Sequence, residues 1–242
     1  MKTVLDKIIA DKKKSIEALY ENNFSFLKNL QKPGLSLIAE IKKASPSRGV
    51  VRADFDPTEL AKQFTHSGAS ALSILTEEDH FLGNPTYIKQ ARAVSSLPIL
   101  RKDFIIDPIQ VYESKFLGAN AILLIKAILT KDQCQTLLNL AKDLQLDILI
   151  EVHTEAELND VLLLKNVQAI GINNRNLQTF EIDLNLALTL AKQIPDGILS
   201  VAESGYSTPE QLHQLEKAGI NAVLIGEGLA THPDLLTFWR NS

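Results

Sequence analysis

The chain has 242 residues, of which 45% are hydrophobic and 22% charged, the balance of an ordinary globular protein. This length accommodates one large domain or two small ones. The formal charge of −4 provides no general attraction to nucleic acid or to an anionic membrane, so we expect neither as a partner. The single cysteine, Cys134, excludes an internal disulfide and a cysteine-rich zinc site.

The first 34 residues differ from the rest of the chain. Apolar side chains recur near one helical face, which predicts an amphipathic helix, and Pro33-Gly34 ends the segment. Residues 1–20 lack a signal-peptide core, and no apolar run in the chain reaches the ~18 residues that a membrane span requires. We therefore expect a cytoplasmic protein with an N-terminal helical extension over residues 1–34.

Eight short apolar runs alternate with longer amphipathic segments after this extension. The runs occupy residues 35–41, 71–75, 98–100, 121–125, 147–151, 169–172, 198–202 and 222–225, and the amphipathic segments include residues 57–66, 84–94, 108–117, 131–144, 155–164, 184–193 and 209–218. Continuous apolar runs are typical of strands covered on both faces. Eight strand–helix units predict an α/β fold, a (β/α)8 barrel of the TIM type, in a single domain over residues 1–242. An open doubly wound sheet has the same alternation and stays an alternative.

Charged and polar side chains close several of the apolar runs. Glu40 and Lys42 are two residues apart, so they point to the same side of the first strand. The same side is expected to collect side chains from later runs, namely Lys102, Glu151, Asn173 and Glu203. Acids and bases at close range have pKa values that are pushed apart, as acid–base catalysis requires. A paired lysine–glutamate network without chemistry is the alternative interpretation.

Glycines follow the last two runs, at Gly205 and Gly226. Phosphate sites of barrels are often built from these two loops, where glycine lets backbone N–H groups approach the anion. We expect Glu227 to contribute its backbone N–H and to direct its side chain away from the phosphate. The polar loop after the first run is expected to be mobile and to bring Lys42 and Ser45 toward the anion.

The histidines do not suggest a metal site. None of the five belongs to an i,i+4 pair or a zinc motif, so we expect no metal ligand. Only His153 lies near the end of an apolar run, and we expect it beside the site or at the surface. Cys134 falls in a helical segment, where we expect no chemical role for it.

Seven segments resemble the motifs of the indole-3-glycerol phosphate synthase family. They are IAEIKKASPS at 38–47, LSILTE at 72–77, LRKDFI at 100–105, LIEVH at 149–153, GINNRNL at 171–177, AESG at 202–205 and LIG at 224–226. The resemblance covers nearly the whole chain. It implies a carboxy-lyase of tryptophan biosynthesis that converts 1-(2-carboxyphenylamino)-1-deoxyribulose 5-phosphate to indole-3-glycerol phosphate, carbon dioxide and water, without a metal or an organic cofactor.

The resemblance also implies catalytic roles. Lys102 matches the family's general acid for ring closure, and its neighbours Arg101 and Lys42 are expected to lower its pKa toward the range useful for proton transfer. Glu151 and Lys42 match the residues of the dehydration step, and the resemblance does not decide which of them is the acid and which is the base. The residues that hold the lysines and the substrate hydroxyls are matched by Glu40, Asn173 and Glu203.

Binding residues follow from the same resemblance. The family's substrate-binding positions are matched by Ser204 and Arg175, and its apolar wall around the anthranilate ring by Phe81, Phe104, Leu123 and Ile225. The anion-binding shell is matched by Ser45, Gly205 and Gly226, and Lys42 is expected to contact the phosphate or the carboxylate. Two positions depart from the pattern: Lys126 replaces an expected apolar residue, and Ala44 stands where some relatives carry a lysine.

Two alternative functions remain. Phosphoribosylanthranilate isomerase is also a phosphate-binding barrel, but it would use a cysteine–aspartate pair, and Cys134 does not close a strand. A catalytically silent phosphate-ligand binder would keep the glycine loops without needing both Lys102 and Glu151. We expect a monomer, because no broad apolar stripe is left unassigned, and we expect the helix over residues 1–20 to cover the active-site end of the barrel.

Overall fold

The computed structural model describes residues 25–240 and, before them, residues 6, 8, 9, 12 and 13. Eight parallel strands close into a barrel in the order β1-β10-β9-β8-β7-β6-β5-β4. They are β1 (Ser36–Ile41), β4 (Ala71–Leu75), β5 (Ile99–Lys102), β6 (Ala121–Ile125), β7 (Asp147–Val152), β8 (Ala169–Asn173), β9 (Leu199–Glu203) and β10 (Ala222–Ile225). Pairing of β10 with β1, with Ser36 opposite Ala222, rules out the open sheet and confirms the predicted barrel.

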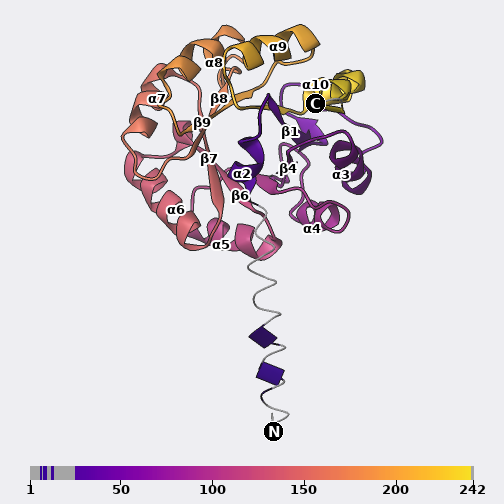
Figure 1. The fold of residues 1–242 in the computed structure, drawn as a ribbon, viewed down its shortest axis with the longest axis vertical. Coiled ribbons are helices and arrows are strands. Elements are labelled where there is room, and N and C mark those ends of the chain that lie inside the picture. Colours follow the sequence, from indigo (N-terminus) through magenta and orange to yellow (C-terminus); the bar gives the residue numbers. More distant parts are fainter. Residues whose placement is uncertain (1–5, 7, 10–11, 14–24, 241–242) are drawn as a thin grey trace.

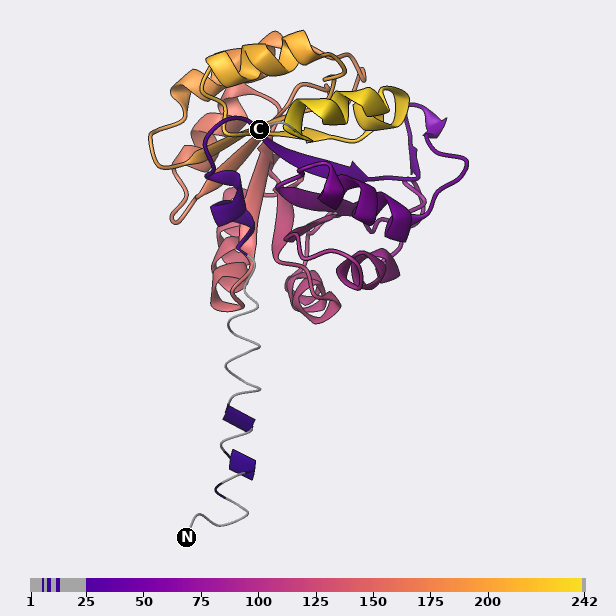
Figure 2. The same ribbon diagram turned by 45° about the vertical axis from the view of Figure 1, so that its right-hand side comes forward.

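Helices surround the outside of the barrel (Figures 1 and 2). They are α3 (Pro57–His66), α4 (Thr86–Arg92), α5 (Pro108–Leu117), α6 (Lys131–Asp143), α7 (Glu155–Leu162), α8 (Asn185–Leu190), α9 (Pro209–Lys217), α10 (Glu227–Thr231) and α11 (Thr237–Arg240), with 3-10 turns η1 (Lys126–Ile128), η2 (Ala191–Gln193) and η3 (Pro233–Leu236). Asp107 and Thr208 each form a capping box, and a proline follows each of them, so the local sequence explains where α5 and α9 begin.

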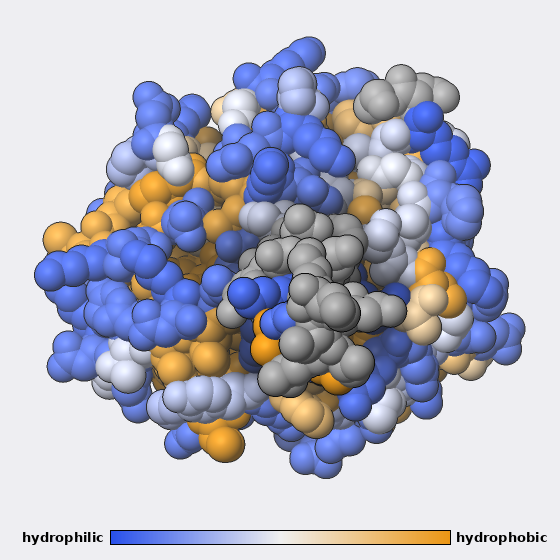
Figure 3. All heavy atoms as spheres, turned by 60° about the horizontal axis from the view of Figure 1, so that its bottom comes forward, coloured by the Kyte–Doolittle hydropathy of each residue, from blue (hydrophilic) through white to orange (hydrophobic). Residues whose placement is uncertain are grey.

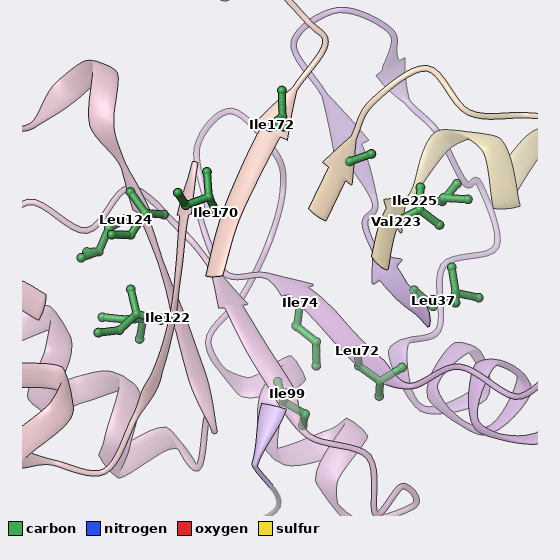
Figure 4. Packing of buried hydrophobic residues seen from close by; sticks show 14 of the residues in the cluster. Leu37, Leu72, Ile74, Ile99, Ile122, Leu124, Ile170, Ile172, Val223 and Ile225 are labelled. Carbon is green, nitrogen blue, oxygen red and sulfur yellow. The ribbon is translucent and has the colours of Figure 1, made fainter. Parts of the chain in front are cut away.

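Side chains of each strand alternate between two hydrophobic layers. Leu100 and Leu149 point into the barrel, whereas Ile99 and Ile150 pack between the strands and the helices. Figure 4 shows part of this outer layer, including Ile99. Burial on both faces explains why the strands have continuous apolar sequences.

A short helix, α2 (Phe26–Leu30), closes the end of the barrel where the strands begin. The Leu27 backbone N–H donates to Asp147 Oδ2 at 3.1 Å, and the Asn29 side chain donates to the Ser70 carbonyl at 3.0 Å. This part of the extension therefore lies opposite the carboxyl ends of the strands. The predicted helix over residues 1–20, and its place over the active-site end, fall mostly outside the described residues.

We expect Phe26→Ala to lower the free energy of unfolding by about 3–5 kcal/mol, because the ring is wholly buried inside the barrel end. Urea denaturation measures this change. The control is Phe116→Ala, since the Phe116 side chain is 80% exposed, and its effect is expected to be small. Equal losses for the two variants would contradict the packing of α2 inside the barrel.

An apolar stripe lies exposed on α5. Ile109, Tyr112 and Phe116 follow the i, i+3, i+7 spacing of one helical face, and each is more than half exposed. Figure 3 shows hydrophobic areas on the face at the bottom of Figure 1, where α5 lies. The expectation that no apolar stripe is left over is therefore wrong, because the hydrophobic side of α5 is wider than the part that packs on the barrel. Within the described part of the chain, no helix is long and apolar enough to span a membrane.

Candidate active site

One pocket at the carboxyl-terminal end of the barrel contains every site residue expected from the sequence. It encloses 1030 Å³, part of which is open to solvent. The predicted residues that line it are Glu40, Lys42, Ser45, Phe81, Lys102, Phe104, Leu123, Glu151, Asn173, Arg175, Glu203, Ser204, Gly205, Ile225, Gly226 and Glu227. They come from all eight strands and the loops that follow, because alternate residues at the strand ends point inward.

Lys102 lies at the centre of the polar cluster. Its Nζ is 2.7 Å from Glu151 Oε2 and 2.8 Å from Glu203 Oε2. Burial alone would lower the Lys102 pKa, but the negative charges of Glu151, Glu203 and Glu40 outweigh it and raise the pKa. The expected decrease is therefore wrong for the protein without substrate.

Arg101 does not act on Lys102 as expected. The two residues are adjacent in β5, so their side chains point to opposite faces. Arg101 is buried on the outer face, where its guanidinium is 2.9 Å from Asp103 and 2.7 Å from Glu113. Its charge is thus matched by Asp103, which borders the pocket, and by Glu113 of α5.

Glu151 accepts hydrogen bonds on both oxygens. Lys102 donates to Oε2, and the Asn173 amide donates to Oε1 at 3.2 Å. His153 Nε2 is 3.1 Å from the same Oε1. Burial alone would raise the Glu151 pKa, but Lys102 and His153 lower it well below its usual range. Glu151 is thus ionised while Lys102 and His153 face it.

The pKa of Glu203 is shifted in the direction opposite to that of Glu151. Its Oε1 is buried and has no hydrogen-bond partner among the described residues. Burial raises the Glu203 pKa to about 8, with Lys102 opposing the shift and Glu151 adding to it. Two neighbouring carboxyls with pKa values this far apart can hold one proton between them at neutral pH.

The absence of a side chain at Gly171 in β8 and at Gly226, which follows β10, makes room for two of the carboxylates. A Cβ on Gly171 would lie 2.2 Å from Glu203 Oε1, and a Cβ on Gly226 would lie 2.3 Å from Glu40 Oε1. Glu40 in turn is 2.7 Å from Lys42 Nζ. Gly226 is therefore required by the side chain of Glu40, a role that the glycine-loop argument did not predict.

Gly171→Ala is expected to displace the Glu203 carboxylate, to lower kcat about tenfold or more, and to cost about 1–3 kcal/mol of unfolding free energy from overpacking. Steady-state kinetics and urea denaturation measure the two effects. Adding Glu203→Ser removes the clashing oxygens, so it should restore stability but not kcat. Unchanged kcat in Gly171→Ala would show that the position of Glu203 is unimportant.

Glu227 contradicts the expectation that its side chain points away from the residues predicted to bind the anion. Its Oε1 accepts from Ser45 Oγ at 3.3 Å, and its Oε2 is 3.2 Å from Arg175 and 3.3 Å from Arg48. Lys42 Nζ is 3.9 Å from Oε1. These cations attract the carboxylate, so a phosphate that used them would compete with Glu227.

The apolar side of the pocket holds two aromatic rings. Those of Phe81 and Phe104 are 6.1 Å apart between centroids. Ile225 borders the pocket, but its side chain packs in the outer hydrophobic layer (Figure 4). Sequence reasoning missed Phe180, which also lines the pocket. It lies in the irregular loop after β8, where no periodicity marks it.

The loop after β1 is more regular than predicted. β2 (Ala44–Ser45) and β3 (Gly49–Val50) pair as a short antiparallel hairpin.

The structure also places two residues to which sequence reasoning assigned no role. Lys126 begins η1 and lies 3.1 Å from Asp160. Cys134 is buried in α6, where burial raises its pKa to about 11 and keeps the thiol protonated at neutral pH. Among the residues described, no group of three or more His, Cys, Asp or Glu side chains could hold a metal ion.

A closed barrel with partly buried lysines and buried carboxylates gathered at its mouth defines the class: a (β/α)8-barrel protein equipped for acid–base catalysis. The family model described as "Indole-3-glycerol phosphate synthase" matches residues 4–241, and the chain belongs to this family. A relative of that name from Chloroherpeton thalassium is 44% identical over 99% of both chains. Another from Polaromonas naphthalenivorans is 53% identical over 79% of this chain and 73% of its own length.

The fold has more distant counterparts. The N-acetylmannosamine-6-phosphate 2-epimerase from Clostridium perfringens superimposes with a TM-score of 0.62 over 86% of this chain and 93% of its own. The two sequences are 16% identical, so the likeness concerns the barrel fold alone.

Proposed function

We propose that the chain closes the indole ring in tryptophan biosynthesis, converting 1-(2-carboxyphenylamino)-1-deoxyribulose 5-phosphate to indole-3-glycerol phosphate, carbon dioxide and water as a carboxy-lyase. The observation that carries the proposal is Lys102 Nζ held between Glu151 and Glu203 in a pocket with an apolar wall and a cationic rim. An acid beside an aromatic-ring site and an anion site suits this substrate.

Ring closure is assigned to Lys102. As the ring carbon that bears the carboxylate attacks the ribulose carbonyl, Lys102 Nζ donates a proton to the carbonyl oxygen, which becomes a hydroxyl. The C–C bond to the carboxylate then breaks, carbon dioxide leaves, and the bonding electrons restore the aromatic ring. Glu40, Asn173 and Glu203 hold the two lysines and the substrate hydroxyls.

Dehydration is assigned to Lys42 and Glu151 together. The hydroxyl departs as water with a proton from one member of the pair, and the other member takes the proton from the adjacent carbon. Counted over all steps, two protons enter and one leaves, so each turnover consumes one proton, which balances the loss of a carboxylate as neutral carbon dioxide.

Substrate binding is divided between the two sides of the pocket. Phe81, Phe104 and Leu123, with Ile225 at the border, hold the anthranilate ring so that the reacting carbons meet. Arg175 and Ser204 bind the substrate's polar groups. The phosphate is assigned to Lys42, Ser45, Gly205, Gly226 and the backbone N–H of Glu227.

The setting is also a proposal. Residues 1–242 form one barrel domain with residues 1–34 as its extension. It acts in the cytoplasm on a small phosphorylated substrate, with no metal, organic cofactor, nucleic acid or membrane involved.

Mixing purified protein with the carboxyphenylamino-deoxyribulose phosphate tests the activity. We expect indole fluorescence to rise, with one carbon dioxide released per indole formed. Folded protein that binds the substrate and forms no indole would overturn the proposal in favour of a silent binder.

A further inference from the structure

His153 is buried between two carboxylates behind the proposed acid–base cluster. Its side chain is 7% exposed, with Nε2 3.1 Å from Glu151 Oε1 and Nδ1 3.4 Å from Glu157 Oε2. Both contacts are at ion-pair distance without full hydrogen-bond alignment, a common state of sites without substrate. The His153 backbone N–H also donates to Glu157 Oε2 at 2.8 Å, so α7 anchors the ring from behind.

The charges around His153 come from four neighbouring segments. Glu151 belongs to β7 and Glu157 to the first turn of α7. Lys126 of η1 acts on Glu157 and is itself paired with Asp160. A second cavity, which shares Asn173 with the active-site pocket, is lined by both His153 and Glu157 and by Glu181 and Asp183 of the loop after β8. Carboxylates predominate around the imidazole.

This arrangement matters when Lys102 gives up its proton. In the resting cluster Glu151 faces two cations, Lys102 on Oε2 and His153 on Oε1. Proton transfer to the substrate makes Lys102 neutral, and a buried carboxylate left without a cation is strongly destabilised. An imidazolium at His153 keeps Glu151 paired through that step.

We propose, resting on the proposed function, that His153 is a positioning residue: held by Glu157, it orients the Glu151 carboxylate and balances its charge while Lys102 is deprotonated. His153 acts through Glu151 and does not touch the substrate. Its charge state agrees with this role. Burial alone would lower the His153 pKa, but Glu151 and Glu157 outweigh it and raise the pKa to about 9, so the ring is cationic at neutral pH.

His153→Gln separates charge from position, because an amide nitrogen near the place of Nε2 can still donate to Glu151 but carries no charge. We expect kcat to fall at least about tenfold with KM little changed. The acidic limb of the kcat profile should move to higher pH, because Glu151 loses a cation and binds protons more readily. His213→Gln, which alters an exposed histidine paired with Glu216, is the matched control.

Glu157→Gln tests the same role without touching the imidazole. Loss of the Glu157 charge should lower the His153 pKa, so the alkaline limb of kcat should begin at lower pH than in the wild type. The histidine resonance followed by NMR gives the same pKa without turnover, and it serves if His153→Gln does not fold.

Wild-type kcat with unmoved limbs in His153→Gln would overturn the proposal. So would a fall in kcat with both limbs in place, which indicates packing alone. If the wild type forms no indole, the proposed function fails and this role falls with it. If the wild type is active and the His153 and Glu157 variants behave like the His213→Gln control, the role of His153 fails but the proposed function stands.

Discussion

Lys102→Met is expected to reduce kcat by about 1,000-fold, because it removes the ammonium group that lies between Glu151 and Glu203 and is assigned to donate a proton to the carbonyl oxygen. Lys102→Arg separates acidity from charge. A guanidinium keeps the positive charge but does not release its proton, so its kcat should be nearly as low. The measurement is indole formation at saturating substrate.

Lys62→Met is the matched control for the Lys102 variants. Lys62 is an exposed lysine of α3 that is paired with Glu59 far from the pocket, and its loss should leave kcat unchanged. Near wild-type kcat in Lys102→Arg would mean that charge suffices and that another group is the acid. A tenth or more of wild-type kcat in Lys102→Met would sink the assignment altogether.

The alternation of side chains between the two faces of each strand explains how much of the site was predictable. A barrel buries both faces of each strand, so a charge inside a continuous apolar run must point to the mouth or have its own partners. Glu40, Lys102, Glu151 and Glu203 all follow that rule and meet in one pocket. Arg101 follows it too, on the outer face, where Asp103 and Glu113 pair with it.

Properties that depend on distances between strands were not predictable. The sequence places Arg101 beside Lys102, but the folded chain surrounds Lys102 Nζ with glutamates from β7 and β9, which reverses the direction of its pKa shift. Likewise, the side chain of Glu227 turns toward Arg175 and Ser45, which lie far away in sequence. The pocket side chain of Phe180 comes from a loop without a periodic pattern.

Glu151→Gln is expected to lower kcat by about 100-fold to 1,000-fold, because the amide keeps the shape of the side chain but cannot accept a proton. It should also change its neighbours. Without the Glu151 charge, Glu157 alone opposes burial at His153, so the His153 pKa should fall from about 9 toward its ordinary value of 6.5. Kinetics and histidine NMR resonances measure the two effects.

The same variant predicts a pH window for stability. Glu151 has a lowered pKa, so its contribution is full above its ordinary value of 4.5 and is lost as pH falls further. His153 has a raised pKa, so its contribution is full below pH 6.5 and is lost as pH rises through about 9. The loss of unfolding free energy in Glu151→Gln should therefore be largest between these two ordinary values and smaller at alkaline pH. At alkaline pH the substitution also removes the repulsion between the Glu151 charge and ionised Glu203.

Glu113→Gln is the control for that window, since Glu113 pairs with Arg101 on the outer face and is about half exposed. Urea denaturation from pH 4 to pH 10 compares the two variants with the wild type. A loss in Glu151→Gln that does not depend on pH would mean that the Lys102–Glu151–His153 charges are not coupled to folding. A His153 pKa that stays near 9 in this variant would show that Glu157 alone sets it, and Glu151 would then be held by Lys102 and Asn173 without help from the imidazolium.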